Sequence, residues 1–168
     1  MEKRSAQKGF TLIELLVVIV LISALAVAVF TALNPAQRLK DARDARRTTD
    51  VDQVLSAIHQ SIVDARGTYP SNMPAANAER QLGTGNSTDC TTALTSGGCN
   101  TPAATACVDL MTGSQNLAKY LKSMPIDPTA GTTYTALKTG YSVVQDSNGI
   151  VTIRACGTEG STNVSASR

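Results

Sequence analysis

The sequence contains few of the residues that enzymatic chemistry requires. It has a single histidine, His59, and no serine, cysteine or lysine lies in a recognisable nucleophile motif. A glycine-rich phosphate loop and paired metal ligands are also missing. His59 follows Ile58 in an amphipathic stretch, where a lone histidine is typical of the boundary between a buried and an exposed face. We therefore predict a protein that is not an enzyme and that needs neither a cofactor nor a metal.

A surplus of positive charge, which a nucleic-acid partner would require, is missing as well. The formal net charge is +2, from 15 basic and 13 acidic residues. The first nine residues hold Lys3, Arg4 and Lys8 against Glu2, so the rest of the chain has 12 residues of each sign. This balance lacks the basic footprint of nucleic-acid binding, and we expect no direct nucleic-acid partner.

One long apolar run dominates the first part of the chain. It extends from Phe10 to Leu33, about 24 residues, with Glu14 as its only charge. At 1.5 Å per residue, such a helix can cross a hydrocarbon core of roughly 30 Å. The apolar core of a secretory signal has only about 7–15 residues, and no clean cut site follows this run. We predict a single membrane-spanning helix.

A short polar leader precedes the apolar run and ends at Lys8-Gly9. Its basic residues Lys3, Arg4 and Lys8 are expected to keep the N-terminus in the cytoplasm and to send the rest of the chain outward. Gly9 has no side chain, so a protease can approach the backbone closely there. The sequence thus favours a cut before the apolar helix rather than after it.

The stretch that begins at Lys8 resembles the N-terminal signature of type IV prepilins, with the sequence KGFTLIELLVVI. The resemblance implies that a prepilin peptidase cuts between Gly9 and Phe10 and that the new amine of Phe10 is methylated. It also implies a helical homopolymer made with the help of a pilus assembly platform. The subunit would rest in the cytoplasmic membrane before assembly and lie in an extracellular filament at the cell surface afterwards.

Glu14 allows two interpretations. A carboxylate inside an apolar helix costs a few kcal/mol or more at the bilayer centre. In the simpler interpretation, Glu14 lies at the headgroup boundary and favours the positive end of the helix dipole. The resemblance implies the other, an assembly role in which Glu14 neutralises the Phe10 amine of a neighbouring subunit inside a helix bundle.

Cys90, Cys99, Cys107 and Cys156 all follow the apolar run, on the side that faces an oxidising compartment. We therefore predict two disulfides. Zinc is disfavoured, because Cys90 and Cys99 are too far apart for a zinc knuckle and no histidine lies nearby. Of the three pairings that four cysteines allow, we favour Cys90 with Cys99, closing a small loop, and Cys107 with Cys156, joining the last strand to a helix.

A second helical stretch follows the apolar run. Asn34-Pro35 is typical of a helix start or kink, so we expect the membrane helix to bend there. Apolar residues then recur at helical spacing, and Gly67 supplies a stop signal. The apolar positions are Val51, Val54, Leu55, Ile58 and Ile62.

Charges of both signs crowd this helix before its apolar stripe. Lys40 with Asp44 and Arg46 with Asp50 are four residues apart, which predicts a solvated helix stabilised by its own ion pairs. In the alternative, these charges set one subunit in register with the next, since surface charge selects partners more than it adds affinity.

The C-terminal half is predicted to contain mostly strands. Leu110 to Met124 suggests a short, interrupted helix, and Thr132 to Lys138 suggests a strand. Tyr141 to Gln145 and Ile150 to Cys156 form a predicted hairpin. Residues 158–168 are small and polar, which is typical of a frayed tail.

The region around Asp127-Pro128 resembles, more loosely, the C-terminal part of pilins and pseudopilins. A calcium site like that of major pseudopilins would need Asp127, Asp146 and Asn148 to converge, although their spacing fits no known calcium loop.

The predicted fold is α+β, with a long N-terminal helix packed on a small antiparallel sheet, as in pilins. The predicted segments are a cleaved leader (1–9), a transmembrane and assembly helix (10–33), an amphipathic helix (34–66), a surface loop (67–106), a C-terminal helix and sheet region (107–157) and a flexible tail (158–168).

The favoured function is that of a type IV pilin. The alternative is a pseudopilin of a type II secretion or DNA-uptake machine. A less favoured alternative is a single-pass, membrane-tethered binding protein or enzyme, which would need no scissile Gly9.

Overall fold

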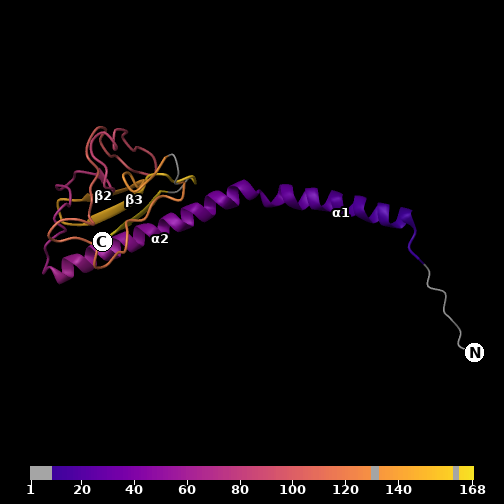
Figure 1. Cartoon of the computed structure of the whole chain (residues 1–168), viewed down its shortest axis with the longest axis horizontal. Coiled ribbons are helices and arrows are strands. Elements are labelled where there is room, and N and C mark those ends of the chain that lie inside the picture. Colours follow the sequence, from indigo (N-terminus) through magenta and orange to yellow (C-terminus); the bar gives the residue numbers. More distant parts are fainter. Residues whose placement is uncertain (1–8, 130–132, 161–162) are drawn as a thin grey trace, which may run out of the picture. The chain divides into compact units, whose positions relative to one another are not determined.

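The computed structural model describes residues 9–129, 133–160 and 163–168, and it has the α+β fold that the sequence predicts (Figure 1). The chain divides into two compact units, residues 1–39 and residues 40–168. The elements are α1 (Leu12–Leu33), α2 (Pro35–Asp64), β1 (Arg80–Gln81), β2 (Tyr141–Gln145), β3 (Val151–Ala155) and β4 (Val164–Ser167). Apart from Gly9, the predicted leader lies outside the described residues.

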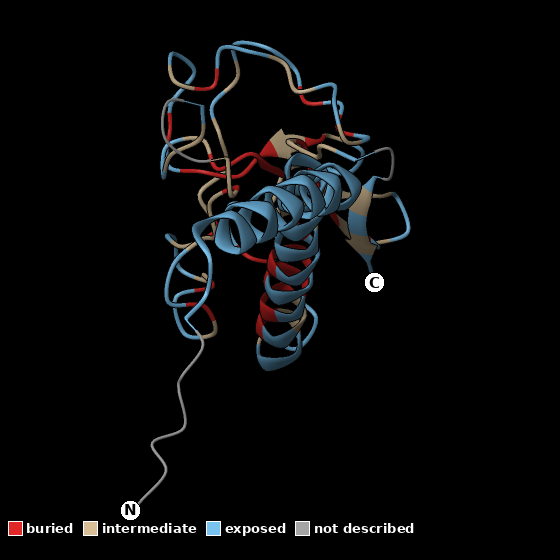
Figure 2. Ribbon diagram, turned by 90° about the vertical axis from the view of Figure 1, so that its right-hand side faces the viewer, coloured by how far each residue is buried: buried red, intermediate tan, exposed pale blue. Residues whose placement is uncertain are grey.

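Helix α1 forms most of the first unit. Its 22 residues contain one acidic side chain, Glu14, and none of them is buried (Figure 2). By length and composition, the helical stretch that starts at Leu12 is long and apolar enough to cross a membrane. The apolar run therefore forms the helix that its composition predicts.

Asn34 separates the two helices. It has a left-handed backbone conformation, with φ 40°, which asparagine tolerates better than most residues. Its carbonyl accepts hydrogen bonds from Gln37 N–H at 3.1 Å and Arg38 N–H at 3.3 Å, and Pro35 occupies the first position of α2, where no N–H is needed. The sequence Asn34-Pro35 therefore ends one helix and starts the next.

Helix α2 packs on the sheet through the apolar stripe that the sequence predicts. Val51, Val54, Leu55 and Ile58 are buried, and Ile62 is half-buried at the edge of the same core. The helix ends through the Gly67 N–H, which donates to the Ile62 carbonyl at 2.8 Å while Gly67 has φ 92°. A glycine is favoured at this position because the left-handed conformation strains other residues.

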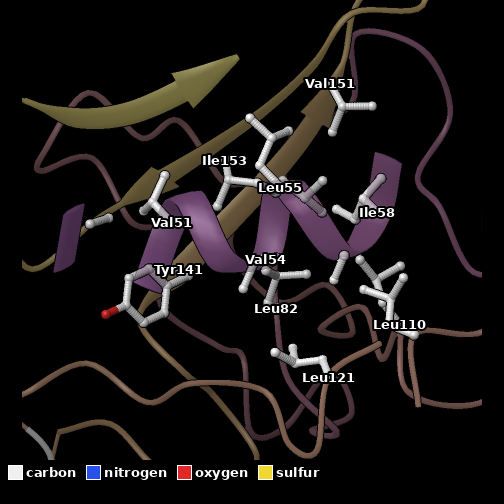
Figure 3. Packing of buried hydrophobic residues seen from close by; sticks show 14 residues of the cluster. Val51, Val54, Leu55, Ile58, Leu82, Leu110, Leu121, Tyr141, Val151 and Ile153 are labelled. Atoms are coloured by element: carbon white, nitrogen blue, oxygen red, sulfur yellow. The ribbon is translucent and has the colours of Figure 1, made fainter. Parts of the chain in front are cut away.

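The sheet is antiparallel, with its strands in the order β1-β2-β3-β4. The predicted hairpin is confirmed, since β2 pairs with β3 from Tyr141 opposite Ala155 to Gln145 opposite Val151. Figure 3 shows side chains of α2 between Val151 and Ile153 on one side and Leu110 and Leu121 on the other. The buried face of α2 thus contacts both the sheet and the segment that contains Leu110 and Leu121.

The helix predicted between Leu110 and Met124 is wrong. This region consists of turns, although Leu110, Leu117 and Leu121 are buried at the spacing that suggested a helix. Side chains compete with helical hydrogen bonds here: Asp109 Oδ1 accepts from Met111 N–H at 2.9 Å, and Asn116 Oδ1 accepts from Ala118 N–H at 3.1 Å.

Two predictions near the C-terminus are also corrected. Residues 133–138 form no strand, because Thr135 and Lys138 exchange backbone hydrogen bonds at 3.0 and 3.1 Å and close a turn; Thr132 lies outside the described residues. The predicted frayed tail contains β4, which pairs with β3. Val164 and Ala166 pack against the core, so β4 gains burial that its polar composition does not suggest.

Both disulfides join other partners than those predicted. Cys90 pairs with Cys107, with Cα atoms 5.9 Å apart, and Cys99 pairs with Cys156, with Cα atoms 5.6 Å apart. The first pair meets because the loop returns to its own start, where Cys107 N–H donates to the Gly85 carbonyl at 3.0 Å. The middle of that loop lies against the end of β3, where Cys156 follows. Sequence spacing carries no information on this fold-back.

Candidate assembly site at the start of α1

The N-terminal end of α1 is built by Thr11 and Glu14. The Thr11 hydroxyl accepts a hydrogen bond from the Glu14 N–H at 3.3 Å. In return, Glu14 Oε2 accepts hydrogen bonds from the Thr11 N–H at 3.0 Å and from the Thr11 hydroxyl at 2.8 Å. This reciprocal arrangement is a capping box, which satisfies N–H groups that the first helical turn leaves without partners.

Sequence reasoning identified Glu14 but missed Thr11 as its partner. The signal was present, since Thr11-Leu12-Ile13-Glu14 has the T-x-x-E spacing of a capping box. The prepilin resemblance drew attention to the charge of Glu14 instead. Thr11 and Glu14 therefore form one capping pair.

The residues around the Thr11–Glu14 capping pair are apolar. Glu14 lies among five exposed apolar residues on the surface of the chain. They are Phe10, Ile13, Leu15, Val17 and Val18. Phe10 and Leu12 are 89% and 83% exposed, and exposed apolar surface on this scale marks contact with lipid or protein. The start of α1 therefore has one carboxylate within an apolar surface of the kind that contacts lipid or another protein.

Gly9 lies just before Phe10 and is exposed. A Cβ added to Gly9 would meet no atom within 4 Å. The described chain itself therefore makes no steric demand for glycine at this position. Any such demand must come from another molecule that approaches the backbone.

A second polar group lies in the other unit and was not predicted. Arg47 is completely buried and forms a two-pronged ion pair with Asp127, from Nε to Oδ2 at 2.7 Å and from Nη2 to Oδ1 at 2.8 Å. Its Nη1 donates to Asp44 Oδ1 at 2.6 Å. Burial opposes the charge of Arg47, but these hydrogen bonds raise its pKa. The pair joins α2 to the turn at Asp127-Pro128.

The position of Arg47 in the helix contained a signal for this pair. Arg47 lies four residues before Val51 and seven before Val54, so it shares their face. An arginine in line with an apolar stripe must find a buried carboxylate or face a large desolvation cost. Because several charged residues surround Arg47 in the sequence, its place on the apolar face was missed.

Arg43 extends the same network toward the C-terminal segment. Its guanidinium binds both carboxylate oxygens of Glu159, with Nη2 at 2.7 Å from Oε1. The hydrogen bond from Arg43 lowers the pKa of Glu159 to about 2. This network stabilises the contact of α2 with Asp127 and Glu159, because its carboxylates are already bound to arginines.

The charged helix face only partly follows the sequence prediction. Arg46 and Asp50 form the expected pair at 3.8 Å. Asp44 instead binds Arg47 and accepts from the Gly160 N–H at 2.8 Å, so it serves the tertiary fold rather than pairing with Lys40. Asp50 also accepts from the Tyr141 hydroxyl at 2.7 Å. Burial and this hydrogen bond raise the pKa of Tyr141.

The calcium alternative does not fit this geometry. Asp127 is bound to Arg47, and Asp146 Oδ1 accepts from the Asn148 and Ile150 N–H groups at 2.8 Å each within its own turn. Across residues 9–129, 133–160 and 163–168, no three histidine, cysteine or acidic side chains gather as a metal site would require.

These features define a chain with an apolar, exposed N-terminal helix and a small disulfide-bonded α+β unit. The family model described as the prokaryotic N-terminal methylation motif matches residues 4–30. The chain therefore carries the prepilin-type motif, which supports a type IV pilin-like or pseudopilin precursor and a structural subunit rather than an enzyme. No curated protein and no solved structure shows a significant match to the chain.

Proposed function

We propose that this chain is a type IV pilin, a structural subunit that polymerises through α1 into an extracellular filament. The observation that carries the proposal is the position of the methylation motif, which runs directly into a helix without a single buried residue. A helix of this composition is unstable in water unless lipid or other helices cover it. Copies of the same helix supply such a cover after the subunit leaves the membrane.

Before assembly, α1 anchors the subunit in the cytoplasmic membrane with its N-terminus inside. The basic leader residues Lys3, Arg4 and Lys8 support this direction. The second unit then lies outside, where an oxidising compartment permits both disulfides.

Processing takes place between Gly9 and Phe10. A prepilin peptidase removes the leader and methylates the new Phe10 amine, which keeps its positive charge. With the help of an assembly platform, the subunit then enters the filament, where Glu14 of one subunit neutralises the amine of a neighbour. An unpaired ion buried among apolar helices would cost several kcal/mol, so the pair favours one register between subunits.

The alternative is a pseudopilin of a type II secretion or DNA-uptake machine, which shares the motif and the processing. The two differ in where the polymer resides. A long filament recovered by shearing intact cells favours the pilin, and a polymer confined to the envelope favours the pseudopilin. A simple membrane anchor would show neither polymer nor cleavage at Gly9.

The direct test of processing is Gly9→Val. A branched side chain blocks the approach of the peptidase, so the variant is expected to stay in the membrane as an uncut precursor. Folding does not confound the result, because a Cβ at Gly9 meets no atom within 4 Å. Ile13→Val is the matched control within the same motif and is expected to be cut. Mature protein of normal size from Gly9→Val would contradict the proposal.

A further inference from the structure

The turn between β2 and β3 contains the one asparagine of the sequence that a glycine follows, Asn148-Gly149. We infer that Asn148 is a modification site, at which the turn permits spontaneous loss of the side-chain amide and conversion to aspartate and isoaspartate. The only co-reactant is water, and no enzyme or oxidant takes part. The inference goes beyond the proposed function, because it concerns the folded subunit before and after polymerisation alike.

The reaction joins the side chain of Asn148 to the backbone of Gly149. The Gly149 nitrogen attacks the side-chain carbonyl carbon Cγ, so that a bond between these two atoms forms and the bond from Cγ to Nδ2 breaks. The amide group leaves as ammonia, together with the proton of the Gly149 N–H. Water then opens the five-membered imide. Opening at Cγ gives aspartate, and opening at the backbone carbonyl gives isoaspartate, in which the chain continues through the side chain.

The first requirement is a side chain that is accessible and loosely held. Asn148 is exposed in the hairpin turn. Among the described residues, its side-chain amide makes a single hydrogen bond, from Nδ2 to Asp146 Oδ2 at 3.4 Å, which is longer than a typical N–H···O bond. This bond restrains the amide only weakly, so Cγ is free to approach the next residue.

The second requirement is a backbone nitrogen that nothing crowds. Gly149 has no Cβ, so no side chain of its own hinders the approach of its nitrogen to Cγ. Its N–H donates to the Asp146 carbonyl at 3.2 Å, at the long end of the usual range. The turn needs glycine here for another reason, since Gly149 has φ 88° in the left-handed region. The residue that suits the turn therefore also suits the reaction.

The contacts of the turn show what the modification changes. Asp146 Oδ1 accepts hydrogen bonds from the N–H groups of Asn148 and Ile150 at 2.8 Å each. The Gly149 carbonyl accepts from the Tyr69 hydroxyl at 2.8 Å, which ties the hairpin to the segment after α2. Isoaspartate adds one carbon to the backbone between these bonded groups, so the bonds cannot all persist. Its carboxylate also lies near that of Asp146, and like charges repel. We expect a weakened hairpin and one added negative charge.

The test incubates the full, detergent-solubilised chain at mildly acidic and mildly alkaline pH and follows its peptides by mass spectrometry. Asn77 is the internal control, because it is exposed and its N–H donates to the Gln145 carbonyl of the same hairpin at 2.6 Å, but Ala78 follows it. A synthetic peptide of residues 144–151 is the reference without a fold. Asn148 is expected to be converted to aspartate and isoaspartate, faster at alkaline pH because the attacking nitrogen must lose its proton. Asn77 is expected to remain intact.

Two variants separate the reaction from its effects on the fold. Asn148→Gln keeps an amide but would need a six-membered imide, which closes much more slowly, so this variant is expected to remain unmodified. Freshly purified Asn148→Asp has the added charge without the added backbone carbon. The aged wild type is expected to shift by one negative charge in isoelectric focusing and to unfold at lower denaturant concentration. Asn148→Asp is expected to show the charge shift alone, and aged Asn148→Gln neither change.

Three results would overturn the inference. The first is an Asn148 that stays intact in the folded chain after the peptide has been converted. The second is equal conversion of Asn148 and Asn77, which would remove the role of Gly149. The third is conversion of Asn148 to aspartate without any isoaspartate, which would exclude the imide.

Discussion

The two helices of this chain obtain their burial in opposite ways. Helix α1 has an apolar surface on all sides and buries none of its residues, whereas α2 has a single apolar stripe and buries it within its own unit (Figure 2). One sheet and one packed segment are enough to bury an apolar stripe. A helix that is apolar all round needs a cover on every side, which a unit of this size does not supply.

The same contrast applies to the charged residues. Among the described residues, Glu14 in α1 hydrogen-bonds to Thr11 in its own turn, while Arg47 in α2 binds Asp127 from a distant part of the chain. The charge of Arg47 is therefore paired within the fold, whereas the carboxylate of Glu14 stays on the exposed surface of α1.

The largest expected effect is on assembly, from Glu14→Leu. This variant should insert in the membrane and be cut as before, because it deletes a costly charge and leaves the scissile bond untouched. Its polymer yield should fall to background, since the amine of an incoming subunit would be buried without a counter-ion. Shearing and quantifying the polymer measures the effect, with Ile13→Leu as the apolar control. Wild-type yield from Glu14→Leu would reduce Glu14 to a boundary residue.

The next effect is on the stability of the second unit, from Arg47→Met. Removing one partner of a buried ion pair typically costs about 3–5 kcal/mol, and both side chains here have 0% exposure. Chemical denaturation of the detergent-solubilised protein measures the loss. Arg46→Met is the matched control one residue away, with a side chain 64% exposed, and should change the free energy of unfolding by less than about 1 kcal/mol. Equal effects from the two variants would refute the buried pair.

The two disulfides should contribute unequally. The Cys99–Cys156 bond spans 57 residues and the Cys90–Cys107 bond spans 17. In the chain-entropy model, removing the longer link costs about 1 kcal/mol more, within a typical range of about 2–5 kcal/mol. Paired alanine variants of each bond, compared by chemical denaturation, measure the difference. Peptide mapping under non-reducing conditions that recovered Cys90 linked to Cys99 would restore the pairing expected from sequence.

The smallest effect concerns pH. Arg43 lowers the pKa of Glu159 from its ordinary value of 4.5 to about 2, so the folded state favours the charged form. The stabilisation is present above pH 4.5 and is lost as the pH falls toward 2. In Glu159→Gln, the acid side of the stability curve should be flatter over this interval. A curve of unchanged slope would show that Glu159 is free in solution.

Local patterns allowed much of the fold to be predicted. The apolar run, the stripe from Val51 to Ile62 and the hairpin around Gly149 depend on period and turn chemistry, which neighbouring residues determine. The regions that failed depend on distant contacts. Cys99 meets Cys156 because a long loop folds back on β3, and β4 exists because a core receives Val164 and Ala166. Neither fact is encoded in local spacing.

The candidate site was predicted to a similar extent. The motif predicted a helix that starts near Phe10; Gly9 and Phe10 lie just before α1, and Glu14 lies in its first turn. Thr11 was overlooked because it acts through a hydrogen bond rather than a charge, although the T-x-x-E spacing indicates a capping box. Arg47 was overlooked because a buried charge depends on Asp127, which lies 80 residues away.

The most direct test of the central claim is the mass of the N-terminal peptide from polymer sheared off intact cells. The account predicts a peptide that starts at Phe10, carries one methyl group on its amine and contains no leader residue. Polymer whose subunits still begin with Met1, or whose Phe10 is absent from the N-terminus, would contradict the claim that cleavage at Gly9 prepares α1 for assembly.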